Sequence, residues 1–138
     1  DSSLRAQIKW PPTKRVHRSI EKATRSYADN VSMLLDVCRA LIIFEEIKDL
    51  HSCLDAILKD TEVSVLRIKN RLKLDYDSWQ SLGYRDVCLN LRIQTEVTEE
   101  FSVNLHVVEL QLILSAFMDQ KNDDGHRGYV AYRNLVGI

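Results

Sequence analysis

The chain has 138 residues, of which 45% are hydrophobic, and it contains only two prolines and four glycines, as fits one compact domain with a sizeable core. A formal net charge of -1 excludes a global field that would attract nucleic-acid backbones non-specifically. No run reaches the roughly 18 apolar residues that a membrane span requires, and the N-terminus lacks a signal-peptide layout, so we expect a cytoplasmic or otherwise intracellular protein.

The N-terminus begins with Asp1-Ser2-Ser3 and has no initiator methionine. We therefore expect a piece of a larger protein, with an extended segment over residues 1–13 and one domain over 14–138. The three cysteines, Cys38, Cys53 and Cys88, are odd in number and widely spaced, which favours reduced thiols over a disulfide framework. The histidines form no metal-ligand spacing, and we expect no structural metal.

The first half of the chain predicts a helix, a strand and a second helix. Residues 14–27 carry a helical period on a mostly charged segment that follows Pro11-Pro12. Branched residues predict a strand from about Asp36 to Phe44. Apolar residues at helical spacing between 47 and 58 predict a packed helix of about three turns.

The second half predicts three strands and closing helices. A strand over 63–68 is followed by a long polar loop over 70–82, of the kind that covers a site or an interface. Strands over 83–93 and 107–112 are close enough for an antiparallel hairpin. We expect a helix over 112–118, a turn at 123–125 and a last helix over 126–135. This order predicts an α/β (α+β) fold, a mixed, largely antiparallel sheet flanked by helices.

The strand over 83–93 has two unlike faces, because side chains alternate along a strand. Its apolar face comprises Val87, Leu89, Leu91 and Ile93. The other face, which we expect to be open to chemistry, comprises Tyr84, Asp86, Cys88, Asn90 and Arg92. Glu109 lies inside the next apolar run, where a carboxylate requires a cation, a metal or a set of donors. An ion pair with Arg92 is the structural alternative.

Five short motifs follow one another along the chain. They are Lys14–Lys22, Leu35-Asp36-Val37-Cys38-Arg39, Arg67-Ile68-Lys69-Asn70-Arg71, Gly83-Tyr84 and Glu109-Leu110-Gln111. In order and spacing they resemble the alarmone synthetase domain of RelA/SpoT-like proteins, over roughly residues 14–132. This resemblance implies a nucleotidyltransferase-like fold that moves pyrophosphate from ATP to the ribose of a guanine nucleotide, with relatives that modify tRNA ends.

The resemblance also implies roles for particular residues. Asp36 and Glu109 would be the catalytic carboxylates and would bind Mg²⁺ together. Tyr84 would stack on the guanine base. The full set of nucleotide-binding candidates is Arg15, Ser19, Lys22, Arg39, Lys69, Arg71, Tyr84, Asp86, Gln111 and His126. Without the resemblance, the charged members of this set are ordinary solvated side chains and Tyr84 is a packing residue.

Several positions depart from the family pattern: Leu41 replaces an arginine, Asn70 an aspartate, Asp86 a serine and Cys88 a histidine. Arg39 lies two residues before Leu41, on the same face by strand parity, and is a candidate substitute. We expect Asp86 and Cys88 on the open face, where a carboxylate would repel phosphates unless it binds a second metal.

Two functional hypotheses follow. The first is a pyrophosphokinase-related domain that binds ATP-Mg²⁺ and either a guanine nucleotide or an RNA-end acceptor. The alternative is a catalytically divergent or inactive copy of the fold that serves as a nucleotide-sensing, scaffold or protein-interaction domain in a larger assembly. An unrelated α/β interaction domain is a third interpretation, in which the ordered motifs are coincidence.

Overall fold

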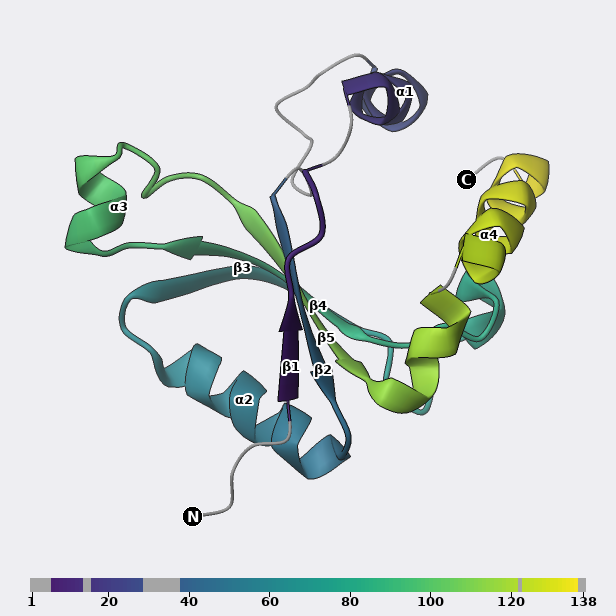
Figure 1. Ribbon diagram of the computed structural model, residues 1–138. Helices are drawn as coiled ribbons and strands as arrows, with labels where there is room; N and C mark the ends of the chain where they lie inside the picture. Colours follow the sequence, from purple (N-terminus) through teal and green to yellow (C-terminus); the bar gives the residue numbers. More distant parts are fainter. Residues whose placement is uncertain (1–5, 14–15, 29–37, 122, 137–138) are drawn as a thin grey trace.

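One mixed sheet runs through the computed structural model, which describes residues 6–13, 16–28, 38–121 and 123–136. Within these ranges five strands lie in the order β1-β2-β5-β4-β3. They are β1 (Ala6–Lys9), β2 (Arg39–Phe44), β3 (Val63–Asn70), β4 (Val87–Ile93) and β5 (Val108–Leu114). The β2–β5 pair is parallel and the other neighbouring pairs are antiparallel, which confirms the mixed, largely antiparallel sheet (Figure 1).

Helices lie on both sides of the sheet. The helix α2 (Ile47–Lys59) covers one side, while α1 (Val16–Tyr27) and α4 (Asp123–Val136) stand over the other (Figure 1). Three short helices lie in connections: η2 (Ser78–Ser81), α3 (Glu96–Glu100) and η3 (Ser115–Lys121). In the ranges that the structure describes, no helix is both long enough and apolar enough to cross a membrane.

The main core lies between α2 and the sheet face that we call the core face. Leu50 of α2 packs with Phe44, Leu89 and Leu112, all of which have 3% or less of their surface exposed. The predicted alternation along β4 is confirmed for Val87, Leu89 and Leu91, whose side chains are all buried. Ile93 departs from it, because the end of the strand extends past the core and leaves this side chain 42% exposed.

Three expected element boundaries are wrong. The strand expected from residue 83 begins at Val87, because Leu82 and Gly83 have φ angles of 51° and 83° and form a turn. The helix expected from residue 112 is still strand β5 up to Leu114, since residues 112 and 113 are fully buried in the sheet. The turn expected at 123–125 is the first turn of α4.

Candidate functional site

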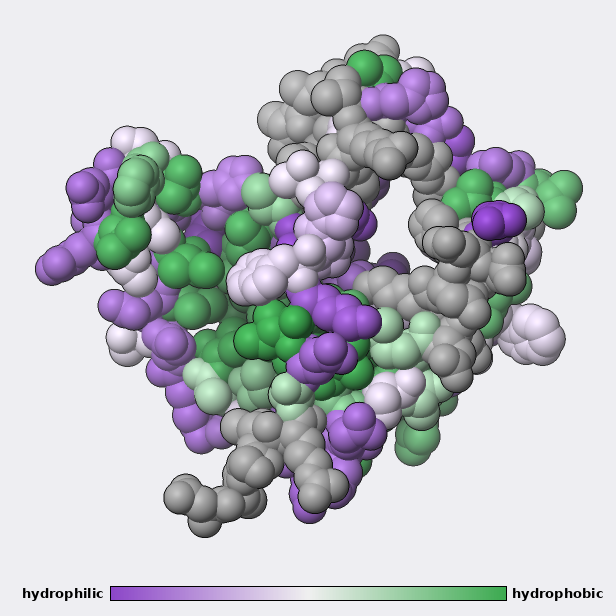
Figure 2. Space-filling view, in the orientation of Figure 1, coloured by the Kyte–Doolittle hydropathy of each residue, from purple (hydrophilic) through white to green (hydrophobic). Residues whose placement is uncertain are grey.

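The sheet face opposite α2 carries polar side chains from four strands, and we call it the polar face. Its members are Arg39, Arg67, Lys69, Cys88, Asn90, Glu109 and Gln111. Glu109 lies between Arg39 on β2 and Asn90 on β4, each one strand spacing of about 4.8 Å away. Figure 2 shows the surface hollowed above the sheet, between α1 and α4. The candidates predicted on these strands therefore share one open side of the molecule.

Glu109 is half-buried, and Cys88 on the neighbouring strand is within hydrogen-bonding reach of its carboxylate. Burial and the negative charge of Glu109 raise the pKa of the Cys88 thiol to about 12, so the thiol stays protonated and can donate a hydrogen bond to the carboxylate. Arg92, the ion-pair partner considered from sequence, donates from Nε to the carbonyl of Leu105 at 3.0 Å. A carboxylate inside an apolar run is thus accommodated because its side chain faces the polar side of the sheet.

Arg39 and Leu41 lie on the same face, as strand parity predicts. Leu41 is 3% exposed and packs with Ile43 and Ile113, so an apolar cluster fills the position where the family has an arginine. The Arg39 guanidinium donates from Nη2 to the carbonyl of Pro12 at 3.2 Å, and its buried Nε has no hydrogen-bond partner among the described residues. A buried donor without an acceptor favours an anion at this place.

Asp86 is wholly buried, so the expectation that it lies on the open face is wrong. Its Oδ1 accepts a hydrogen bond and ion pair from Arg71 Nη1 at 2.5 Å, and its Oδ2 accepts the Tyr84 hydroxyl at 2.9 Å. We call these three residues the Asp86 triad. Burial, together with the charge of Asp86, raises the pKa of Tyr84, whose phenol therefore remains a donor.

Arg85 holds the loop that precedes the triad. Its guanidinium donates to the carbonyls of Arg71, Lys73 and Tyr76 at 2.9–3.2 Å and lies 5.6 Å from the centre of the Tyr76 ring. Ser81 Oγ donates to the Tyr84 carbonyl at 2.6 Å. This scaffold was not predicted from the sequence. Arg67, part of a predicted motif but not among the nucleotide-binding candidates, lies on the same face as Lys69 by strand parity.

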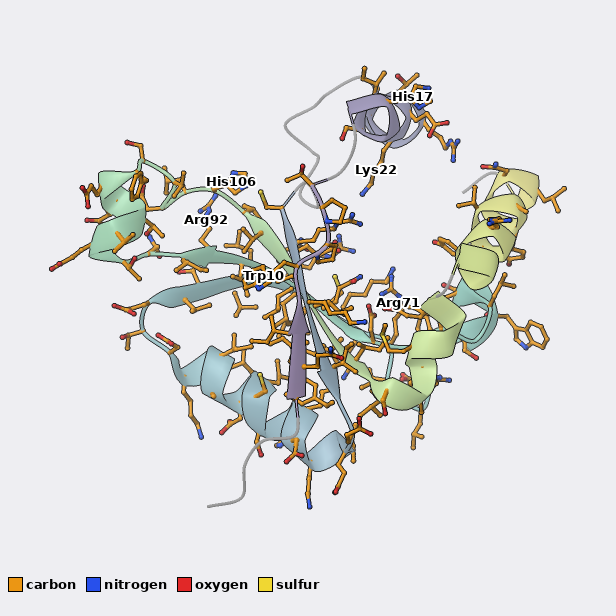
Figure 3. All side chains as sticks on the ribbon, viewed as in Figure 1. Trp10, His17, Lys22, Arg71, Arg92 and His106 are labelled. Atoms are coloured by element: carbon orange, nitrogen blue, oxygen red, sulfur yellow. The ribbon has the colours of Figure 1, made fainter. Side chains whose placement is uncertain are left out.

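The remaining candidates come from elsewhere. Ser19 and Lys22 are half-buried on α1, and Figure 3 shows Lys22 extending toward the sheet while Arg71 points into the space between the sheet and α4. The helices α1 and α4 are linked by a hydrogen bond from Arg25 Nη1 to Asn134 Oδ1 at 3.2 Å. Two candidates, Arg15 and Asp36, lie outside the described residues, and the His126 backbone lies on α4.

The structure resembles solved alarmone synthetases. The small alarmone synthetase 1 from Bacillus subtilis, bound to its product pppGpp, matches with a TM-score of 0.72 and 17% identity. A GTP pyrophosphokinase family protein from Streptococcus pneumoniae matches with a TM-score of 0.68 and 14% identity. A chain in the crystal structure of the complex between the type VI effector Tas1 and its immunity protein matches with a TM-score of 0.54 and 18% identity.

These matches cover 96%, 99% and 91% of this chain but 66%, 64% and 61% of the three solved chains, in the same order. The chain thus spans no more than about two thirds of their length. No protein-family model matches the sequence, and no curated protein matches it in a sequence search. The agreement lies in three dimensions, in the mixed five-stranded sheet and its helices. The chain has the α+β fold of the RelA/SpoT-like small alarmone synthetases.

Proposed function

We propose that this domain binds ATP-Mg²⁺ and a guanine nucleotide or an RNA-end acceptor, and transfers pyrophosphate from ATP to a ribose hydroxyl of the acceptor. The observation that carries the proposal is the position of Glu109, half-buried on the polar face between Arg39 and Asn90. The likeness in fold to alarmone synthetases supports the reaction class.

The reaction requires positioning and charge neutralisation more than covalent chemistry by the protein. The acceptor hydroxyl oxygen bonds to the β-phosphorus of ATP, the bond from that phosphorus to the α-phosphate bridging oxygen breaks, and AMP leaves. Glu109 is the group placed to accept the hydroxyl proton. Arg39 and Lys69, with Lys22 from α1, supply positive charge for the phosphates. Tyr84 provides a ring for the purine base and Gln111 a polar contact beside it.

Among the residues that the structure describes, we propose Glu109 as a ligand of the magnesium ion. Magnesium takes one or two carboxylates together with substrate phosphates, so a ready-made protein cage is not required. In the described ranges no three His, Cys, Asp or Glu side chains form such a cage. We propose Asp36 as the second carboxylate. When bound, the ion would neutralise charge on the phosphate oxygens.

A second candidate function is nucleotide sensing or scaffolding without turnover. Two observations favour it: Leu41 fills an apolar cluster where the family has an arginine, and Asp86 neutralises the charge of Arg71. Both reduce the positive charge available to a triphosphate. The transferase and the sensor both require nucleotide binding and differ in turnover, whereas a scaffold requires neither, so binding must be measured before activity.

The first test is calorimetric titration with a non-hydrolysable ATP analogue and with GDP, each with and without Mg²⁺. We expect binding of the ATP analogue to depend on magnesium and to be lost in Asp36→Asn. The matched control is Asp55→Asn, which changes an exposed carboxylate on α2, on the opposite side of the sheet. Binding, together with AMP release in a separate assay with ATP and the acceptor nucleotide, supports the transferase, whereas binding without AMP release in that assay supports the sensor. If neither nucleotide binds, the transferase and the sensor are both wrong, and the result favours a scaffold that retains only the fold.

A further inference from the structure

Each oxygen of the buried Asp86 carboxylate accepts a hydrogen bond from a protein side chain. One oxygen accepts Arg71 Nη1 and the other accepts the Tyr84 hydroxyl, while the backbone carbonyl of Asp86 accepts the Arg71 amide at 2.8 Å. With none of its surface exposed, the residue has no atom available to a ligand. A buried carboxylate is stable only when its oxygens are satisfied in this way. Asp86 can therefore act only through the two side chains that it holds.

Tyr84 is constrained at both ends as a result. Its ring packs against the apolar cluster of Leu41, Ile43 and Ile113, and its hydroxyl is tethered to Asp86. A ring that is packed on one side and hydrogen-bonded at its tip keeps one rotamer. A preorganised ring loses little conformational entropy when a base stacks on it.

Arg71 completes the arrangement rather than providing a free cation. Its side chain is 20% exposed, its Nη1 is bound to Asp86, and its buried Nε has no hydrogen-bond partner among the described residues. Because Asp86 cancels its charge, Arg71 attracts a phosphate less than Lys69 does, since Lys69 is exposed and has no carboxylate partner in the described ranges. The guanidinium thus holds the Asp86 carboxylate in position to accept the Tyr84 hydroxyl.

We propose that Asp86 is a positioning residue that fixes the Tyr84 ring for the purine base of the acceptor nucleotide. The inference rests on the proposed function, and it deepens that function by separating an acceptor side, governed by the Asp86 triad, from an ATP side that includes Arg39 and Lys22. A change at Asp86 therefore alters acceptor affinity selectively. A general loss of structure would instead lower the affinity for both nucleotides together.

The test measures the affinities for GDP and for the ATP analogue in Asp86→Asn and Tyr84→Phe. The asparagine keeps the shape of the side chain but weakens the Arg71 and Tyr84 contacts, and we expect GDP affinity to fall about tenfold while ATP-analogue affinity stays within about twofold. Tyr84→Phe keeps the ring and the Arg71–Asp86 pair, so we expect it to fold even if Asp86→Asn does not, and it should lower GDP affinity about threefold or more.

The double variant Asp86→Asn/Tyr84→Phe should lose less GDP affinity than the two single effects combined, because both changes break the same tether. The control is Asp77→Asn in the preceding loop, whose side chain caps η2 by accepting from the Trp79 amide. It should leave both affinities within about twofold.

Unchanged GDP affinity in Tyr84→Phe, equal losses for both nucleotides, or fully additive effects would each overturn the positioning role while leaving the proposed function intact. A wild-type protein that binds neither nucleotide would instead overturn the proposed function, and this inference with it.

Discussion

The two faces of the sheet are built from the same strands, but one is an apolar core and the other carries the polar groups of the candidate site. Along β4, Leu89 points to the core face and is fully buried, while its neighbour Asn90 points to the polar face beside Glu109. The core face gains its stability by removing apolar surface from water. The polar face keeps carboxylate, guanidinium and amide groups at fixed spacing in an open space (Figure 2).

This difference teaches that stability and chemistry are separated by strand parity. Changes at odd positions of β4 should affect folding, and changes on the polar face should affect binding or turnover. Two groups depart from this separation: the Asp86 triad, which holds a buried carboxylate next to the proposed site, and the apolar cluster of Leu41, Ile43 and Ile113, which is buried on the polar side of the sheet. Four predictions test the separation.

The largest effect is expected from Glu109→Gln on the polar face. If the domain is a transferase, AMP release should fall by about 10²–10³-fold, because a neutral amide neither accepts the proton nor stabilises a magnesium ion. The free energy of unfolding, measured by urea denaturation, should change little. The control is Glu99→Gln on α3, an exposed carboxylate. Equal activity in the two variants would remove Glu109 from the site.

Substitutions on the core face should lower the stability of the fold and leave nucleotide binding unchanged. Leu89→Ala leaves a cavity among Phe44, Leu91 and Leu112 and should lower the free energy of unfolding by about 2–5 kcal/mol. Nucleotide affinity of the fraction that remains folded should be retained. Urea denaturation gives the first quantity and titration calorimetry in buffer the second. A loss of less than about 1 kcal/mol would show that the core face does not support the sheet as described.

The triad predicts a response to alkaline pH. The pKa of Tyr84 is raised in the folded protein, so the folded state holds this proton more tightly than the unfolded state does. The resulting stability is fully present below about pH 10, the ordinary tyrosine pKa, and is lost as the pH rises further. Tyr84→Phe should therefore flatten the decline of the urea midpoint between pH 9 and pH 11. Tyr132→Phe on α4 controls for the loss of one phenol.

The smallest effect on stability is expected from Lys69→Ala. Its exposed ammonium has no carboxylate partner in the ranges that the structure describes, so the free energy of unfolding should change by no more than about 0.5 kcal/mol. Affinity for the ATP analogue should fall several-fold, and more steeply at low salt, because a phosphate contact is lost. A destabilised protein with normal affinity would reverse the comparison of the two faces.

The sequence predicted the alternation of β4, the helix α2 and the order of the main elements, because hydrophobic periodicity is a local property. It failed at Leu112 and Ile113, since a short apolar run fits a buried strand as well as a helix. Boundaries at turns, such as the one before Val87, depend on φ angles that side-chain patterns do not determine.

For the site, parity and motif order placed Arg39, Lys69, Glu109 and Gln111 on strands whose pairing brings them to one face. The environment of Asp86 was not predictable, because its partner Arg71 follows another strand and the carboxylate is buried only when β3 and β4 pair. Nor did local pattern reveal that Arg85 would donate to three carbonyls of the preceding loop.

The parallel pairing of β2 with β5 sets the order in which the chain can assemble. Arg39 and Glu109 are neighbours in the sheet, although α2, β3 and β4 separate them in the sequence. Closing so long a segment is entropically demanding and slows folding. During synthesis, β2 must wait for β5 to leave the ribosome before their hydrogen bonds can form. The polar face is therefore completed late, and a shortened chain that ends before β5 lacks Glu109 and Gln111.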